Sequence, residues 1–492
     1  MSTGFTPSKY QSAVFDFVRA GQGSAAVIAV AGSGKTTTVI EALKYVPEGQ
    51  TAQMFAFNTA IAASLRARLP LNPNVGAATF HSTGYQSLRR HWGLRSLDTN
   101  ANKLMQLSRG MLSGNDKYRY GSFITKLVSL AKGHGVGALT PDTFQVWADL
   151  VAHHDLALDE GEEERGIELA RDLLKVSTES AEEDFLIDFD DQLYLPVLWN
   201  TPVTIRDWVF IDEAQDTNPV RRRLATMSLS DTGRLVAVGD PKQAIYGFTG
   251  ASHDAISQIT EQWDAQELPL SICYRCGIAI VEYAQKLVPQ IEPSPDAGPG
   301  LVETITMRAA LQTLGPADAI LCRNNAPLVS LAYRCLADGV PCQILGRDLG
   351  KNLQALVDKM RASDLDSLCL KLEEFRRREV RKYQEKDQPG KAASVNDRVD
   401  CIQTIIEHLP EDERTLRGLA DALDRLFGEN ITNRLTLSTV HKAKGQEWPR
   451  VGILRPDLMP ARWAHGWQLD QEYNLQYVAW TRAQQALYFI EE

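Results

Sequence analysis

The sequence lacks any uninterrupted apolar stretch of about 18 residues, so we predict no membrane-spanning helix and no membrane partner. Cysteine is also scarce: seven residues among 492 fit a reducing compartment better than a disulfide framework. The first residues, MSTGFTPSKYQ, carry no basic and apolar leader, and we expect no signal peptide. A cytoplasmic location is the expectation that follows.

An excess of positive charge is missing too. The chain has 52 Lys and Arg against 62 Asp and Glu, a formal net charge of −10. A protein whose whole surface attracts nucleic acid is usually basic, so any nucleic acid must bind in a local groove through backbone donors and aromatic stacking. The hydrophobic content of 44% and the charged content of 23% describe a globular protein, and the length predicts two to four domains.

Metal ligands at the usual spacing are scarce. One Cys-x-x-Cys is present, Cys273 to Cys276, but no second closely spaced pair of cysteines or histidines accompanies it. Structural zinc needs about four ligands. We therefore interpret the two cysteines as small residues packed around Tyr274 and Arg275, and we regard a metal site as the weaker alternative.

Short apolar runs alternate with helix-like segments along the chain. The strand candidates are 25–31, 53–58, 207–211, 234–238, 319–323, 342–345, 435–440, 450–454 and 486–490. Such alternation predicts an α/β fold with parallel sheets and crossover helices. The stretch from about 87 to 188 is helix-patterned and lacks convincing strands, and 351–430 is charged and helix-like. We interpret both as helical insertions.

One segment has the pattern of a phosphate-binding loop. Ala29-Val-Ala-Gly-Ser-Gly-Lys-Thr36 follows an apolar strand and precedes a helix. Its glycines let backbone N–H groups approach phosphate oxygens, and the helix N-terminus faces the anion. Lys35 would reach the β- and γ-phosphates, and the Thr36 hydroxyl would hold Mg²⁺. The strict motif has glycine where Ala29 stands, at the position furthest from the phosphates. The sequence therefore predicts binding of ATP or GTP.

A second strand ends in carboxylates. In Val209-Phe-Ile-Asp-Glu-Ala-Gln-Asp216, Asp212 would hold Mg²⁺, through water or directly, and Glu213 would orient or deprotonate the attacking water. Surface acids that cap a helix are the alternative. We favour the catalytic interpretation because the apolar strand directs both carboxylates to one edge of the sheet.

These two segments resemble the first two motifs of superfamily 1 helicases of the UvrD/Rep group, and the remaining motifs follow in order. Segments 239–251, 268–275, 437–447 and 477–483 are similar to the third to sixth. The resemblance implies catalytic roles for Lys35, Asp212, Glu213, Gln243, Arg275 and Arg482, and Mg²⁺ contacts for Thr36 and Asp212. It implies that the nucleotide ATP contacts Gln11, Ala31, Gly32, Ser33, Gly34, Lys35, Thr36, Thr37, Tyr274 and Glu447.

The resemblance gives particular roles to five residues. Gln243 would sense the γ-phosphate, Tyr274 would stack on the adenine, and Gln11 would read the adenine edge. Arg275 and Arg482 would contact the γ-phosphate, where positioned arginines are worth about 10³–10⁵ in rate. The segments AFNTAIA, TFHSTGY and QEYNLQYVAWTRA look most like the F-box DNA helicase branch, although no F-box is identified ahead of the motor.

The resemblance also implies a track for single-stranded DNA, on which bases stack at about 1–3 kcal/mol each. The residues implied are Phe57, Thr79, His81, Tyr246, Phe248, Thr439 and His441. The family often has tryptophan where Phe248 stands and arginine where Thr249 stands. Stacking tolerates the first change, and the second implies that one phosphate contact is either weaker or supplied elsewhere.

The family's fold would be two RecA-like parallel-sheet motor domains, each with a mainly helical insertion. We expect the first at 1–86 and 189–266 with insertion 87–188, and the second at 267–350 and 431–492 with insertion 351–430. The implied activity is an ATP-dependent helicase or translocase that moves 3′→5′ on single-stranded or tailed duplex DNA. Hydrolysis would alternately close and open the two motor domains.

Two alternatives stay open at this point. The small second insertion also suits a translocase that strips proteins from DNA with little unwinding. A nucleotide-gated binding module with little turnover belongs to another class, and the intact set of catalytic residues argues against it. A separately encoded nuclease or repair partner is compatible with the sequence, and RNA is a less favoured substrate.

Overall fold

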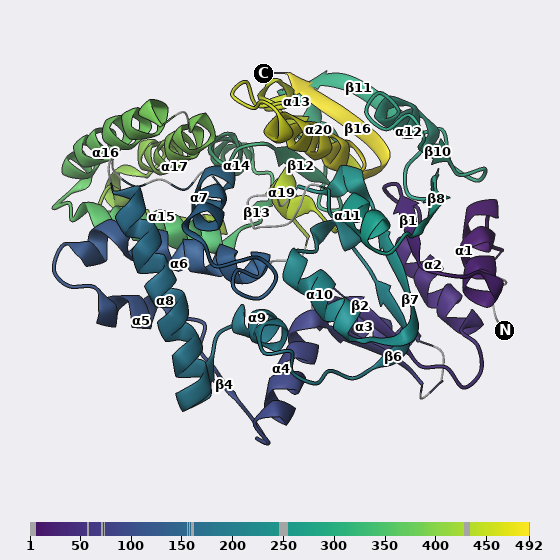
Figure 1. Cartoon of the computed structure of the whole chain (residues 1–492). Coiled ribbons are helices and arrows are strands. Elements are labelled where there is room, and N and C mark those ends of the chain that lie inside the picture. Colours follow the sequence, from purple (N-terminus) through teal and green to yellow (C-terminus); the bar gives the residue numbers. More distant parts are fainter. Residues whose placement is uncertain are drawn as a thin grey trace. The chain divides into compact units, whose positions relative to one another are not determined.

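The computed structural model describes residues 6–56, 59–69, 72, 74–154, 156, 158, 162–245, 254–386, 388–427 and 433–491. The chain divides into two compact units. The first comprises Met1–Val30 and Gly34–Ser271, and the second comprises Ala31–Ser33 and Ile272–Glu492. Each unit contains a six-stranded sheet with helices packed on it (Figure 1).

The sheet of the first unit is entirely parallel, with strand order β3-β2-β6-β7-β1-β8. Its strands are β1 (Ala25–Ala29), β2 (Ala52–Ala56), β3 (Val75–Thr79), β6 (Arg206–Ile211), β7 (Leu229–Gly239) and β8 (Gln266–Leu270). Both faces are buried. In β6, Trp208 and Phe210 join one apolar cluster while Val209 and Ile211 join another. This explains why the strand reads as a continuous apolar run.

Helices cover both faces of this sheet. They are α1 (Lys9–Ala20), α2 (Lys35–Ala42), α3 (Thr59–Arg68), α4 (Phe80–His91), α10 (Pro219–Met227) and α11 (Ala255–Gln262). Val14 of α1 and Val39 of α2 pack in the cluster on one face, and Leu224 of α10 and Ile259 of α11 pack in the cluster on the other. The carboxyl ends of the strands therefore form an edge framed by helix starts, which is where ligands bind in open α/β sheets.

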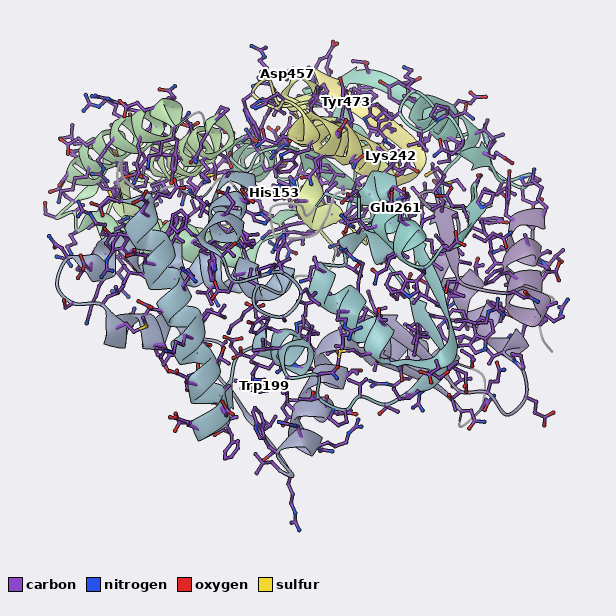
Figure 2. The ribbon with its side chains drawn as sticks, viewed as in Figure 1. His153, Trp199, Lys242, Glu261, Asp457 and Tyr473 are labelled. Atoms are coloured by element: carbon purple, nitrogen blue, oxygen red, sulfur yellow. The ribbon has the colours of Figure 1, made fainter. Side chains whose placement is uncertain are left out.

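A helical insertion lies between α4 and β6. It contains α5 (Lys103–Met111), α6 (Asp116–His134), α7 (Phe144–His153), α8 (Glu163–Asp184) and the short strands β4 (Asp98–Thr99) and β5 (Leu186–Ile187). The following helix, α9 (Asp191–Leu198), ends at Trp199, which is labelled in Figure 2. These helices share one apolar core, in which Trp147 is fully buried.

Four charged side chains are buried inside this insertion. Lys103 and Lys132 each lie within 2.8 Å of Asp191, and Lys132 also lies 2.7 Å from Asp188. Burial alone would raise the pKa of Asp191, but the two ammonium groups lower it overall. Because two lysines face two aspartates, the charges balance, which is the condition under which buried ions are tolerated.

The second unit has a parallel sheet of order β11-β16-β15-β12-β14-β13. Its strands are β11 (Leu301–Thr306), β12 (Ala319–Cys322), β13 (Cys342–Ile344), β14 (Leu435–Thr439), β15 (Trp448–Leu454) and β16 (Ala483–Glu491). Its helices include α12 (Ile278–Ala284), α13 (Met307–Thr313), α14 (Ala326–Ala337), α19 (Val440–Ala443) and α20 (Trp467–Trp480). A two-stranded ladder pairs β9 (Ile272–Cys273) with β10 (Glu292–Pro293).

The insertion of the second unit lies between β13 and β14. It consists of α15 (Arg347–Met360), α16 (Leu365–Glu385), α17 (Pro389–Glu407) and α18 (Leu416–Phe427). Leu353, Leu372 and Val399 of these helices belong to the same apolar cluster as Ile320 and Leu437 of the sheet. The insertion is therefore part of the second unit's core. In the part of the chain that the structure describes, no helix is both long and apolar enough to cross a bilayer.

The predicted fold class, α/β with two parallel sheets and helical insertions, is confirmed. Three strands of the two six-stranded sheets were not predicted, β3, β8 and β11; each contains polar or small residues or proline at alternate positions. The expected boundary at residue 267 falls inside β8. This strand pairs with β1, so the first unit extends to Ser271.

Candidate nucleotide and nucleic-acid site

The phosphate-binding loop connects β1 to α2. Gly34 is the residue that precedes α2, and its φ of 75° is in the left-handed region that favours glycine. Lys35 and Thr36 then occupy the first turn, where backbone N–H groups have no partner within the helix. The Ser33 hydroxyl is buried and has no hydrogen-bond partner among the described residues. A buried polar atom without a partner at a helix start fits an anionic ligand such as phosphate.

The second motif lies at the carboxyl end of β6, in the same sheet. The Thr36 hydroxyl donates to Oδ2 of Asp212 at 3.0 Å, and the Nζ atom of Lys35 lies 3.9 Å from Oε1 of Glu213. Burial and the neighbouring Glu213 charge raise the pKa of Asp212 to about 6. A hydroxyl and a carboxylate oxygen side by side are the ligands that Mg²⁺ prefers, and a dication would stabilise the ionised carboxylate. Thr36 and Asp212 therefore fit the predicted Mg²⁺ contacts.

Glu213 is held by its neighbours. Its φ of 52° is in the left-handed region, which is uncommon for a residue other than glycine. Gln215 donates from Nε2 to Oε2 of Glu213 at 2.5 Å, and Oε1 of Gln215 accepts the backbone N–H of Asp240 at 3.0 Å. The carboxylate that we expect to face the attacking water is thus linked by one side chain to the neighbouring strand, β7.

The third motif begins where β7 ends, in the 3₁₀ helix η3 (Pro241–Gln243). Nε2 of Gln243 donates to Oδ2 of Asp240 at 2.7 Å, and the backbone N–H of Lys242 donates to Oδ1 at 3.0 Å; Lys242 is labelled in Figure 2. Burial raises the pKa of Asp240, while the nearby Lys35 charge opposes the rise. Hydrogen bonds therefore run from Glu213 through Gln215 and Asp240 to Gln243. Sequence reasoning did not assign roles to Gln215 and Asp240, although both lie inside recognised motifs.

Gln11 is buried and its side chain is engaged within the first unit. Its Oε1 atom accepts the backbone N–H of Ser8 at 3.0 Å and its Nε2 atom donates to the Thr38 hydroxyl at 3.1 Å. Ser8 and Gln11 form a capping box at the start of α1. Thr37 accepts a hydrogen bond from Arg68 at 3.1 Å. Both residues lie near the phosphate-binding loop, and their nucleotide contacts stay predictions.

Three residues of the loop, Ala31–Ser33, group with the second unit. The backbone N–H of Ala31 donates to the hydroxyl of Tyr477 at 2.8 Å, and the N–H of Tyr274 donates to the carbonyl of Gly32 at 2.9 Å. A Cβ atom added to Gly32, whose φ is 68°, would lie 2.6 Å from Cβ of Arg275. Gly32 is therefore required for both its backbone conformation and its close neighbours. Arg275 therefore lies next to Gly32, and its contact with the nucleotide stays a prediction.

Arg275 forms an ion pair with Glu447 through its Nε atom. Its Nη1 atom donates to the carbonyl of Thr481 at 3.2 Å, and the other oxygen of Glu447 accepts a bond from Gln484 at 3.1 Å. Tyr274 has its side chain 46% exposed, so its ring is available for stacking. Two residues with predicted nucleotide roles, Arg275 and Glu447, are thus partners of one another.

Arg482 lies in the interior of the second unit, with 1% of its surface exposed. Its Nε atom donates to the carbonyl of Val478 at 3.0 Å and its Nη1 atom donates to the carbonyl of Gln446 at 3.1 Å. These bonds connect the sixth motif to the fifth. The predicted contact of Arg482 with phosphate therefore requires it to change some of these partners.

Some of the residues predicted to contact DNA in the first unit also form hydrogen bonds that stabilise the fold. The Thr79 hydroxyl accepts the backbone N–H of Ser82 at 3.1 Å and caps α4. Burial and the charge of Arg221 lower the pKa of His81 to about 4, so this imidazole is neutral at pH 7. Its ring lies edge-on to the exposed ring of Phe189, with centroids 6.5 Å apart. The predicted contacts Phe57, Tyr246 and Phe248, together with Thr249, lie outside the described residues.

In the second unit, Thr439 is the last residue of β14, His441 lies in the helix α19 that follows, and Arg323 follows the adjacent strand β12. Burial and the charge of Arg323 lower the pKa of His441 to about 3. Arg323 is held by Glu472 of α20 through hydrogen bonds of 2.8 to 3.2 Å. Arg323 and Glu472 were not predicted from the sequence. A signal was present, because Arg323 is the charged last residue of a predicted strand that is otherwise apolar.

Comparison with known proteins covers both units. A family model described as the UvrD/REP helicase N-terminal domain matches residues 11–264, and one described as the UvrD-like helicase C-terminal domain matches residues 347–492. The two matches include the phosphate-binding loop, the carboxylates after β6, and the fifth and sixth motifs.

Individual relatives match over most of the chain at low identity. ATP-dependent DNA helicase UvrD2 of Mycobacterium tuberculosis is 26% identical over 95% of this chain and 76% of its own length. F-box DNA helicase protein 1 of Schizosaccharomyces pombe is 25% identical over 94% of this chain and 55% of its own length. DNA helicase II of Escherichia coli is 24% identical over 53% of this chain and 38% of its own length. The predicted likeness to the F-box branch is thus shared with bacterial relatives, and the comparisons do not single that branch out.

Proposed function

Because the chain belongs to the UvrD/REP helicase family, we propose that this ATP-dependent DNA helicase moves 3′→5′ along single-stranded DNA and separates the duplex ahead of it. The observation that carries the proposal is the hydrogen-bonded series from Thr36 and Asp212 through Glu213, Gln215 and Asp240 to Gln243. It connects the proposed chemistry to the third motif. The direction of movement rests on the resemblance of that motif to the 3′→5′ branch.

For hydrolysis, we assign the phosphates of ATP to Lys35 and to the backbone N–H groups at the start of α2. Thr36 and Asp212 would hold Mg²⁺, which neutralises charge on the phosphates when bound. Glu213 accepts a proton from the attacking water or orients it, because its carboxylate is fixed by Gln215. A general base of this kind contributes about 10²–10⁴ in rate.

For coupling, we assign the γ-phosphate to Gln243, Arg275 and Arg482. Each already has protein partners: Asp240, Glu447 and backbone carbonyls, respectively. A γ-phosphate competes with these partners for the same donors. Its arrival would break the bonds to the protein partners, and its loss would restore them. Such an exchange is a physical route from hydrolysis to domain movement.

For the nucleic acid, we assign the strand to Thr79 and His81 in the first unit and to Thr439 and His441 in the second. Both histidines have pKa values far below 7, so each acts as a neutral hydrogen-bonding or stacking group. We also add Arg323 as a phosphate contact, because its guanidinium lies beside His441.

The test is ATP hydrolysis with and without single-stranded DNA, followed by unwinding of duplexes with a 3′ or a 5′ tail. We expect DNA to stimulate hydrolysis and the 3′-tailed duplex to be unwound. Activity confined to 5′-tailed substrates would overturn the direction. Displacement of a bound protein without duplex unwinding would favour the translocase alternative, which the small second insertion makes reasonable.

A further inference from the structure

Two cysteines bracket the residues proposed to bind adenine and phosphate. Cys273 is the last residue of β9, residues 274–276 form a bend, and Cys276 follows Arg275 directly. Both thiols are free and have at most 2% of their surface exposed. Their sequence spacing is that of redox-active dithiols. The bend that presents Tyr274 and Arg275 therefore begins and ends at a thiol.

The two thiols influence one another. The Cys276 side chain is the main reason why the pKa of Cys273 is lowered, to about 6. The same interaction and burial raise the pKa of Cys276. Arg275 adds to the lowering at Cys273. The two pKa values are therefore shifted in opposite directions, and Cys273 gives up its proton more readily than Cys276.

A route for a small oxidant exists at this point. Cys276 lines an open cavity of about 610 Å³, together with Gly277, Asp296, Gly298 and Arg450. Hydrogen peroxide is no larger than a few water molecules, so a cavity of this volume admits it. The oxidant would therefore reach the Cys276 sulfur from this cavity of the second unit.

We propose that Cys273 and Cys276 form a redox modification site whose disulfide switches off ATP hydrolysis. The Cys276 sulfur, which lines the cavity, attacks a peroxide oxygen and gives up its proton, which yields a sulfenic acid and water. The Cys273 sulfur then attacks the Cys276 sulfur, its proton leaves, and the hydroxyl departs as water. In total two thiols and one hydrogen peroxide give one disulfide and two waters, and a dithiol reductant reverses the change.

The disulfide alters the nucleotide residues because of what the sulfurs touch. The Cys276 thiol donates to the carbonyl of Thr481 at 3.8 Å, and Arg275 donates to the same oxygen at 3.2 Å. Oxidation removes the first donor. A Cβ atom added to Gly32 would lie 2.9 Å from Sγ of Cys273, so this sulfur packs tightly against the phosphate-binding loop. Closing a four-residue ring changes the bend that carries Tyr274 and Arg275, next to this packed contact.

The redox proposal rests on the proposed function, and the experiment tests disulfide formation and ATP hydrolysis separately. The full-length reduced protein is treated with graded hydrogen peroxide. The loss of two hydrogens is measured from the mass of the intact protein. The linked cysteines are identified by mass spectrometry of a proteolytic digest. DNA-stimulated ATP hydrolysis is measured on the same samples. We expect a Cys273–Cys276 disulfide, a fall in kcat of about tenfold or more, and recovery after reduction.

The chain offers a matched control. Cys335 and Cys342 are a second pair of free cysteines, each the main cause of the other's pKa shift, and they lie in α14 and β13. Cys335→Ser should leave the oxidant sensitivity of hydrolysis unchanged. Cys276→Ser should keep the reduced activity and remove the sensitivity, and Cys273→Ala serves the same purpose if the first variant does not fold.

The outcomes distinguish the hypotheses. Full activity in a sample whose mass and digest show the Cys273–Cys276 disulfide would overturn the switch. Oxidation that leaves both thiols free, or sensitivity that survives in Cys276→Ser and disappears in Cys335→Ser, would overturn the site. If the reduced wild-type protein hydrolyses no ATP with DNA, the proposed function fails, while the digest still reports whether the disulfide forms.

Discussion

Both carboxylate oxygens of Glu472 accept hydrogen bonds from the guanidinium of Arg323, two residues that are 149 positions apart. The Glu472 side chain is 6% exposed, and Oε2 also accepts the backbone N–H of Ala461 at 3.1 Å. Bidentate pairing fixes the plane of the guanidinium. Glu472 lies in α20, the helix that leads into Arg482, so one helix connects the proposed strand contact with the proposed phosphate contact.

Glu472→Gln should weaken binding of single-stranded DNA, because the neutral amide fixes Arg323 less firmly. We expect the DNA concentration for half-maximal stimulation to rise and the salt dependence of binding to lose about one phosphate contact. Basal hydrolysis should change little. The double variant Arg323→Met with Glu472→Met removes both charges and is the control for folding. If the salt dependence of DNA binding is unchanged in Glu472→Gln, the pair stabilises the fold and does not position a phosphate contact.

Asp212→Asn should stabilise the protein while it abolishes hydrolysis. The ionised Asp212 is buried beside Glu213, and its pKa of about 6 means that ionisation costs folding free energy above that pH. Without Mg²⁺, we expect the variant to be more stable at pH 8, on the order of 1–3 kcal/mol. The gain should shrink as the pH falls below about 6 and vanish near about pH 4, the ordinary pKa of the unfolded carboxyl. Thermal melts at pH 8 and at about pH 4 test this, and equal stability at pH 8 would contradict it.

Lys35→Ala and Glu213→Gln should each reduce kcat by at least about 10²-fold, the usual contribution of a positioned catalytic group. Glu213→Gln should still bind ATP, because it keeps the loop and the lysine. Equilibrium binding of a fluorescent ATP analogue measures affinity apart from turnover. Wild-type turnover in either variant would refute the assigned role.

Thr79→Ala should destabilise the protein by about 1 kcal/mol, because the hydroxyl caps α4. Thr79→Ser keeps the hydroxyl and should restore the free energy of unfolding. Denaturant titration of the three proteins is the measurement. If Thr79→Ala also lowers DNA affinity while Thr79→Ser does not, the hydroxyl both caps α4 and contributes to binding of the DNA strand.

Lys132→Met should cost about 3–5 kcal/mol of stability, because it leaves Asp188 and Asp191 buried with one ammonium group instead of two. The lowered pKa of Asp191 means that its stabilisation is present above the pKa of the unfolded carboxyl and is lost as the pH falls through the folded value. Lys175→Met, on an exposed ion pair of the same insertion, is the matched control. Similar losses in the two variants would contradict the argument.

Local spacing explains what could be predicted from the sequence. Lys35 and Thr36 are fixed by the turn between a strand and a helix, and Asp212 is fixed by the end of an apolar strand. Each assignment needs only a few consecutive residues, so the pattern suffices. The capping boxes at Ser8–Gln11 and Thr79–Ser82 have an equally local pattern, and they could have warned that these side chains have structural duties.

Tertiary neighbours explain what could not be predicted. Arg323 meets Glu472 only because β12 and α20 pack in one unit, and Gln215 meets Asp240 only because β6 and β7 are adjacent strands. The burial of Arg482 likewise depends on the carbonyl groups of two separate motifs. Periodicity within one segment contains no information about these partners.

The pairing of β1 with β8 has a consequence for how this sequence can diverge. Ala29 is in register with Leu270, and the N–H of Val30 donates to the Leu270 carbonyl at 3.1 Å. Main-chain hydrogen bonds therefore set the alignment of β1, which leads into the phosphate-binding loop, with β8, which precedes Tyr274 in the chain. Replacing side chains in either strand keeps this alignment, whereas adding or deleting one residue inverts the faces of the strand. Related sequences should therefore tolerate exchanges in these ten positions and admit almost no length variation there.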